Sequence, residues 1–350
     1  MAKETTAAPA MQNSLMTRIK DNLPVVLVSV FSLFLVIIVG IKGGPAQLLN
    51  TVIAGGMWAL LAVGLALVFG VMNIPHFAHG ESFMVGAYVA YFVFTPLLKA
   101  LGETPNPVLR AIIPFIGILA AGLVGAVLGV IIERLIFAPL RRRTRSGWVM
   151  NAFLLTVGIS FVMTNGATLT IGPNFRGIPK YWDVDTLNFF GANISVDRLV
   201  AFFIAMITIG ALWFFLRRTR TGRAIRAVSQ DETGAQIVGI NLNFIQTLTF
   251  SLSTATAAIA GAALLFMFQA YPTVGLKPLY FAWYVVMLVG LGNIAGAIVG
   301  GFMVALLQTA TQLFFTITWE TVIPTVVMII VLLIAPSGLF GSEVKGIQEQ

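Results

Sequence analysis

Long apolar runs recur along nearly the whole chain and limit what it can fold into. Residues 46–71 and 242–269 each contain no charged residue, and each is longer than the roughly 20 residues that cross a bilayer core as a helix. Only 10% of all residues are charged, against about 25% in a soluble domain. The sequence therefore predicts an all-α, polytopic bundle of membrane-spanning helices.

The runs divide the chain into about nine predicted spans, some of them interrupted by Gly or Pro: 23–39, 46–71, 81–100, 111–137, 149–171, 199–216, 242–269, 279–315 and 321–335. The polar residues 1–22 are expected to be a disordered cytoplasmic tail. A cleaved signal peptide is the alternative for 23–39, but this stretch is long for a signal and no A-x-A site follows it. We therefore interpret it as a retained, extra N-terminal transmembrane helix.

Basic residues predict the orientation. Loop 133–145 carries five Arg against one acidic residue, and loop 217–232 carries five Arg against two acidic residues. Loop 172–198 balances three basic residues against three acidic ones. Because cytoplasmic loops are enriched in Lys and Arg, the two Arg-rich loops and the N-terminus are predicted to be cytoplasmic, with 172–198 on the opposite side.

The composition excludes several kinds of site. The chain has no Cys and two His, so disulfides, zinc–thiolate sites and thiol catalysis are ruled out. The formal charge of +8 comes largely from the Arg-rich loops, and no soluble domain is predicted that could bind nucleic acid. No Walker-type nucleotide-binding loop and no hydrolase-like Ser/His/Asp order occurs. We expect neither enzymatic activity nor a cofactor.

The stretch "NIPHFAHGE" (residues 73–81) places polar groups between two apolar runs. Pro75 disfavours helix at the residue before it, and irregular backbone at membrane depth survives only inside protein or beside a wet cavity. We therefore predict that this segment lines a path. Three roles are open for His76, His79 and Glu81: a metal site, which lacks further His or Cys ligands; a proton relay; or bonding of freed backbone groups, with Glu81 capping the next helix.

A second interrupted segment echoes the first. The stretches "LVFGVMNIPHFAHGESFMVGA" (67–87) and "LVGLGNIAGAIVGGFMVA" (288–305) share Leu-Val, Gly, Asn-Ile and Phe-Met-Val in the same order. Paired interrupted spans of this kind are typical of transport sites and of inverted repeats. Asn73, with Asn293 opposite, is therefore predicted to line the path. Thr156 and Ser160 are further candidates, although such hydroxyls also bond their own helix backbone.

The segment "RRTRTGRAIRAVSQDETGAQIVGIN" (217–241) contains more than a basic anchor. Its pattern predicts a short amphipathic helix that Gly239 ends on the cytoplasmic side. The small residues Gly234 and Ala235 would let a partner surface come close. Charged contacts to that partner are expected from Arg223, Arg226, Asp231 and Glu232. The alternative is an ordinary basic loop.

Four motifs in order resemble the permease subunits of branched-chain amino-acid ABC importers: "GLALVFGVMNIPHFAHGESFMVGAYVA", "ERLIFAPLRRRTRS", "RTRTGRAIRAVSQDETGAQIVGIN" and "GLGNIAGAIVGGFMVAL". The likeness covers about residues 46–340, which form the predicted permease domain, and is closest to the shorter of the two permeases that such systems carry. It implies a multi-pass subunit of the bacterial inner membrane that pairs with a second permease chain. It also implies two cytoplasmic ATPase subunits, a periplasmic substrate-binding protein, and 222–241 as the segment that couples to the ATPase.

We therefore predict a permease subunit that forms the pathway for branched-chain or hydrophobic amino acids, or for related solutes such as urea, amides and aromatic acids. A separate chain would hydrolyse ATP. The alternative is a stand-alone secondary transporter or channel, for which Glu81 would have to couple an ion. A membrane scaffold without transport is disfavoured, because an ionisable group inside the membrane indicates a functional site.

Overall fold

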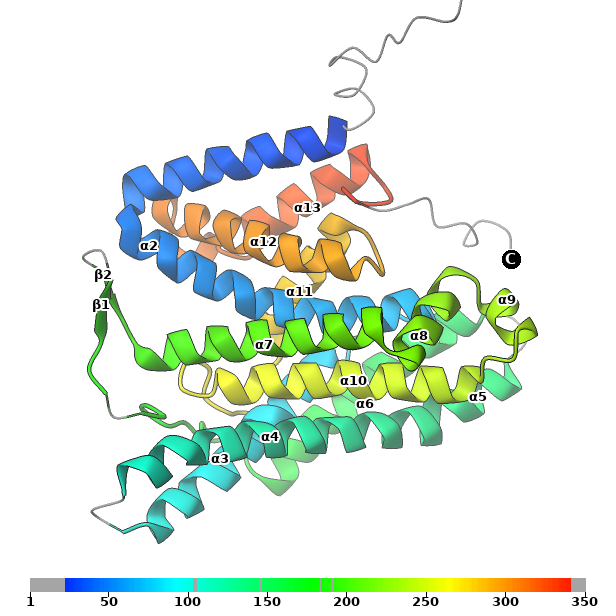
Figure 1. The fold of residues 1–350 in the computed structure, drawn as a ribbon, viewed down its shortest axis with the longest axis horizontal. Coiled ribbons are helices and arrows are strands. Elements are labelled where there is room, and N and C mark those ends of the chain that lie inside the picture. Colours follow the sequence, from blue (N-terminus) through cyan, green and yellow to red (C-terminus); the bar gives the residue numbers. More distant parts are fainter. Residues whose placement is uncertain (1–22, 103–105, 145–146, 183, 190–191, 341–350) are drawn as a thin grey trace, which may run out of the picture.

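The computed structural model describes residues 23–102, 106–144, 147–182, 184–189 and 192–340, so the predicted tail 1–22 lies outside the described residues. Within them the chain is a bundle of helices with one two-stranded hairpin (Figure 1). The long helices are α2 (Leu23–Met72), α3 (His79–Ala100), α4 (Pro107–Ile132), α6 (Trp148–Thr170), α7 (Val196–Arg218), α10 (Leu242–Ala263) and α12 (Ile294–Phe314). The shorter elements are the π-helix η1 (Glu133–Phe137), α5 (Ala138–Arg143), β1 (Leu187–Phe189), β2 (Ala192–Ile194), α8 (Arg220–Gln230), α9 (Glu232–Ile237), α11 (Leu276–Val289), η2 (Ile317–Trp319) and α13 (Val322–Ile334).

Helix α2 is bent into two arms (Figure 1). Gly44 has φ 68° and ψ −176°, a region of backbone conformation that is essentially restricted to glycine. Pro45 follows at the start of the second arm, where its missing N–H leaves no helical hydrogen bond unmade. The predicted span 23–39 is thus a helix that continues to the bend, and it packs on α12 through a small cluster of its own: Leu35, Val39, Leu307 and Ala310.

The prediction of a polytopic helical bundle is confirmed. Seven stretches among the described residues are long and apolar enough to span a membrane, and the first of them, Ser29–Met72, contains both arms of α2. Helix α10 is also 22 residues long but is rich in Ser and Thr. The interrupted segment 279–315, for which one or two crossings were possible from the sequence, forms two helices, α11 and α12.

The two ends of the bundle differ in charge. We call the end that carries α5, α8 and α9 the basic end, and the end that carries the β1–β2 hairpin the hairpin end (Figure 1). The Arg-rich segments and 172–198 therefore lie at opposite ends, as the predicted orientation requires. The segment 133–145 is largely helical, not a loop, because α4 continues through the π-helix η1 into α5, where Pro139 occupies a first-turn position that a proline tolerates.

Two helices begin at half depth instead of at an end of the bundle. His79 opens α3 and contacts Leu61 and Ser253, which lie midway along the second arm of α2 and along α10. Gly275, directly before α11, meets Gly80 so closely that a Cβ on either would overlap the other's backbone. From this meeting point α3 runs to the hairpin end (Figure 1), whereas α11 runs to the basic end.

These helices form an inverted pair. Helix α2 runs to the basic end, and the chain then returns to half depth and continues as α3. Helix α10 runs to the hairpin end, and the chain then returns to half depth and continues as α11. The echoing segments 67–87 and 288–305 do not mark this inversion. Gly292 meets Gly70 at the basic end, so both segments turn there and share one orientation.

Candidate functional site

The break between α2 and α3 is held by α6. Asn73 has φ 52°, a conformation that ends α2 and that Asn adopts more readily than most residues. The Thr156 hydroxyl accepts a hydrogen bond from the Phe77 N–H (3.2 Å), and its single proton lies within reach of two carbonyls, that of Phe153 in its own helix (2.8 Å) and that of Pro75 (3.0 Å). Thr156 therefore contacts backbone groups at the break, while its own helix also offers its hydroxyl an acceptor. Its place on the path stays a prediction.

His79 joins three helices at half depth. Its Nε2 lies 3.0 Å from the Leu61 carbonyl, so this nitrogen carries the proton, and its Nδ1 lies 3.4 Å from the Ser253 hydroxyl. His76 is fully buried, with its ring 5.8 Å from that of His79 and 4.7 Å from that of Phe250. Neither ring nitrogen of His76 has a hydrogen-bond partner among the described residues. Of the two histidines, only His79 has the bonding role that the sequence suggested.

Glu81 lies in the first turn of α3. Its Oε1 also accepts hydrogen bonds across to α6, from the Ser160 hydroxyl (2.6 Å) and the Thr164 hydroxyl (3.4 Å). Its Oε2 is buried without a partner among the described residues. Sequence reasoning missed Thr164, although its spacing of four residues from Ser160, as Ser160 is from Thr156, was a visible signal of one helix face.

The two asparagines have structural roles. Asn73 is exposed near the basic end. Asn293 caps α12, because its Oδ1 accepts from the Gly296 N–H (2.8 Å) while its Nδ2 donates to the Phe340 carbonyl (2.9 Å). Both the oxygen and the nitrogen of the Asn293 side-chain amide are thus hydrogen-bonded within the chain. The structure brings together His76, His79, Glu81, Thr156 and Ser160 around the break, and it leaves Asn293 apart from them as a helix cap.

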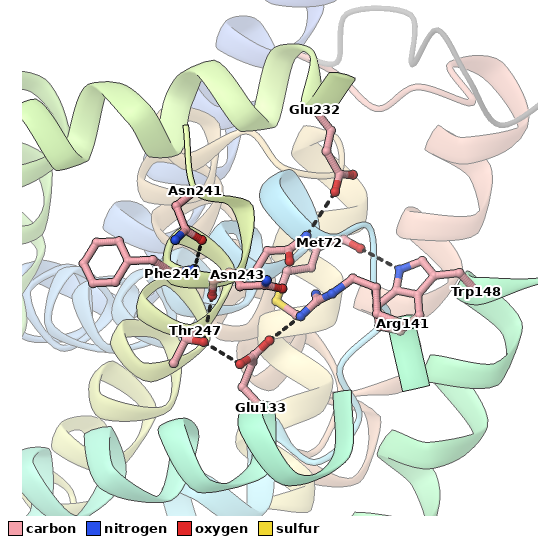
Figure 2. A network of polar contacts seen from close by, with 10 residues as sticks. Met72, Glu133, Arg141, Trp148, Glu232, Asn241, Asn243, Phe244 and Thr247 are labelled. Atoms are coloured by element: carbon pink, nitrogen blue, oxygen red, sulfur yellow. Dashed lines mark hydrogen bonds and ion pairs between the residues drawn. The ribbon is translucent and has the colours of Figure 1, made fainter. Parts of the chain in front are cut away.

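A chain of polar contacts crosses the basic end (Figure 2). Glu133, which is buried in the π-helix, forms an ion pair with Arg141 and accepts from the Thr247 hydroxyl (2.5 Å). The Arg141 guanidinium lies over the Trp148 ring at 5.3 Å, and the Trp148 Nε1 donates to the Met72 carbonyl at 3.4 Å. The last residue of α2 is therefore connected to α6, α5 and α10. Sequence reasoning missed all of these contacts, since they join residues far apart in the chain.

The same network extends to α9. The Gln246 side chain, beside Thr247 on α10, donates to Glu232 Oε1 at 3.1 Å (Figure 2). A cleft of about 470 Å³ opens next to it, between the η1–α5 segment and the start of α10. Its lining includes Glu133, Arg134, Arg142 and Asn241.

The segment 217–241 holds two helices instead of the single predicted one. Asp231 leaves the helical conformation between α8 and α9, and its side chain accepts from the Gly234 N–H at 2.9 Å. Gly239 ends α9 with φ 85°, as predicted. Ala235 is buried against its own chain, so it does not offer a small surface to a partner.

The exposed tip of this segment is apolar. Ile237 and Val238 are 81% and 76% exposed at the basic end, and the sequence analysis did not single them out. Arg223 and Arg226 lie on the exposed face of α8, and Asp231 and Glu232 are exposed at the start of α9. Large apolar side chains exposed beside charges mark a candidate surface for contact with another protein or with the membrane.

Residues 47–332 match the family model described as the permease component of the branched-chain amino acid transport system. The chain belongs to this family. It is therefore a multi-pass membrane permease, a component of a transport system and not an enzyme. The match begins in the second arm of α2, so the first arm precedes the family region.

Similar proteins are also named as transport permeases. The permease is 30% identical over 300 residues to the high-affinity branched-chain amino acid transport system permease protein LivH of Salmonella typhimurium. The alignment covers 84% of this chain and 94% of LivH. It is 29% identical over 303 residues to BraD of Pseudomonas aeruginosa, named for the same transport, with 84% and 95% covered. The ribose import permease RbsC of Escherichia coli is 26% identical over 285 residues, with 79% and 81% covered. No solved structure matches the chain.

Proposed function

We propose that the permease forms half of the pathway of an ATP-driven importer in the cytoplasmic membrane. A second permease chain would supply the other half, and two ATPase subunits and a periplasmic substrate-binding protein would complete the complex. Its substrates would be branched-chain or other hydrophobic amino acids, because LivH and BraD carry that description over most of the chain. The sequence has no nucleotide-binding loop of its own, so the energy would come from a partner.

The proposed pathway runs through the half-depth region. Interrupted helices that begin near the middle of the membrane are a recurring way to build a transport site, since their exposed backbone ends can contact a solute. Here α3 and α11 begin against each other at Gly80 and Gly275. Direct backbone contact leaves no space between them, and we interpret this as the closed state of the pathway.

The observation that best supports the function is the contact route from α9 to the break. It passes from Glu232 through Gln246 and its neighbour Thr247 on α10 to Glu133. Arg141 and Trp148 carry it on to the Met72 carbonyl. An ATPase that moves α9 would therefore act on the end of α2 through bonded and packed groups, which is the kind of contiguous network that can couple two sites.

Docking and transmission can be tested separately in the reconstituted complex. Val238→Asp should lower co-purification of the ATPase and binding-protein-stimulated ATP hydrolysis, since a charge replaces an exposed apolar contact. Val238→Ile is the matched control and should behave as wild type. If Val238→Asp retains both ATPase binding and transport, the tip is not the docking surface.

Trp148→Phe tests the transmission step. It keeps a ring beside Arg141 but removes the Nε1 donor to Met72, a bond worth about 1 kcal/mol. We expect ATPase binding to persist while more ATP is hydrolysed for each leucine transported. An unchanged ratio would show that the route does not carry the coupling.

A further inference from the structure

A groove of about 320 Å³ lies between α3 and α6 in the half of the bundle toward the hairpin end. Its lining is almost wholly apolar: Met84, Val85, Tyr88, Val89, Phe92, Met163, Ala167 and Ile171. The two helices run side by side in the same direction, because α3 residues 81–92 face α6 residues 160–171 in matching order. The volume is at the small end of the range for sites that bind small molecules, about 300–1,000 Å³.

A carboxylate with an unused oxygen lies one helical turn beyond the inner end of this groove. Glu81 lies one helical turn before Met84 and Val85, and Ser160 lies one turn before Met163. The hydroxyls of Ser160 and Thr164 occupy Oε1 of Glu81, whereas Oε2 is buried without a partner among the described residues. A buried acceptor left without a donor costs free energy, so this oxygen is suited to a cationic or N–H donor from outside the chain.

Unused donors lie at the outer end of the same groove. The Arg176 guanidinium stacks over Phe92 at 5.6 Å, and its Nη2 donates to the Ile171 carbonyl at 3.1 Å. Its Nε is buried without a partner among the described residues, and so is the Tyr88 hydroxyl, on which Arg176 acts electrostatically. A guanidinium and a hydroxyl with free donors are suited to a carboxylate.

We propose that this groove is the outer substrate subsite of the permease and that it takes an apolar α-amino acid. The walls contact the aliphatic side chain, Arg176 and Tyr88 bind the carboxylate on entry, and Glu81 binds the ammonium group in a later step. This inference rests on the proposed function and adds the place and the order of binding to it.

The two polar ends act in succession. Glu81 and Tyr88 are seven residues apart on α3, which places them about 10 Å apart along the helix axis. The two charges of an α-amino acid are closer together than this, so we assign the two polar ends to successive steps. A solute arriving from the hairpin end meets Arg176 first with its carboxylate, then moves inward along the apolar wall until its ammonium group reaches Glu81 at half depth.

Cysteine protection tests occupancy directly, because the native chain has no Cys. In the full complex without nucleotide, Met163→Cys places a thiol in the groove. Leu169→Cys, on the opposite face of α6 and 87% exposed in the native chain, is the control. Leucine at about ten times its dissociation constant should slow thiol modification of Met163→Cys about tenfold and leave Leu169→Cys unaffected. 4-Methylpentanoate, which is leucine without the ammonium group, should protect much less at the same concentration.

The charge at Glu81 is tested by Glu81→Gln, which keeps an acceptor for Ser160 and Thr164. Leucine uptake should fall by about tenfold or more and the protection of Met163→Cys should be lost. Unchanged labelling of Leu169→Cys in the same background would show that the fold is intact. Wild-type uptake of leucine without protection of Met163→Cys would overturn the subsite while leaving the proposed function standing. Absence of wild-type leucine uptake would instead overturn the proposed function.

Discussion

The substitution Gly86→Ala tests the close crossing of α3 and α10. Gly86 lies inside α3, and a Cβ built on it would overlap the main chain of Ala258. Gly210 lies inside α7 with open space where its Cβ would lie, so Gly210→Ala is a matched control. Both changes gain about 1 kcal/mol of helix propensity, and only Gly86→Ala must separate two helices.

The expected loss of stability in Gly86→Ala follows from what the new Cβ would contact. Overpacking costs about 1–3 kcal/mol, and the upper end applies here because the contacted atoms belong to backbone and cannot rotate away. We expect Gly210→Ala to raise the free energy of unfolding by up to about 1 kcal/mol and Gly86→Ala to lower it by about 2 kcal/mol. The difference of about 3 kcal/mol between the two variants is the informative quantity.

The measurement is the free energy of unfolding of the purified permease in mixed micelles, titrated with sodium dodecyl sulfate and followed by tryptophan fluorescence. Gly86→Ser should resemble Gly86→Ala, because any β-substituent meets the same backbone. Equal stability of Gly86→Ala and Gly210→Ala would refute the backbone contact between α3 and α10.

Three further outcomes can be checked. His79→Ala removes a buried hydrogen bond and should cost about 1–3 kcal/mol of stability. His79→Asn can still form hydrogen bonds and should keep more transport activity than His79→Ala. If both variants are inactive and the wild-type transport rate follows an imidazole titration, His79 is part of a proton relay instead. A single Cys at Asn188 should react with an impermeant thiol reagent in intact cells, and reaction only after permeabilisation would reverse the predicted orientation. Arg141→Ala leaves Glu133 buried without its cation and should cost about 3 kcal/mol, whereas the exposed Arg142→Ala should have no measurable effect on the same unfolding curve.

The interruptions of the bundle could be predicted from sequence because Gly and Pro act locally. Pro75 and the glycines at 290 and 292 mark the ends of helices that the structure confirms. The bounds were less predictable where propensity and charge disagree. The basic stretch after Glu133 was assigned to a loop, but its Arg, Leu and Ala residues favour helix and extend α4 through a π-helical turn.

The contacts of the site could not be predicted in the same way. For Glu81 the sequence left three roles open, as a metal ligand, a proton carrier or a cap of its own helix, and none of these predicts its partners Ser160 and Thr164, about 80 residues away on α6. Asn293 was expected to face the path, yet it caps α12. In both cases the choice of hydrogen-bond partner depends on how the helices pack, which spacing along the sequence does not contain.

The polar composition of α10 has a consequence for how the protein is made. Its buried face carries Gln246, Thr247, Thr249, Ser251, Ser253, Thr254 and Thr256, and α10 is absent from the described helices that are apolar enough to span a membrane by themselves. Such a segment is a poor candidate for independent transfer from the translocon into lipid. Its neighbours α2, α3 and α4 are all synthesised earlier, so they can already be in the membrane when α10 leaves the ribosome. We therefore expect biogenesis of this permease to depend on the order of synthesis, and a circular permutation that placed α10 first should fail at insertion.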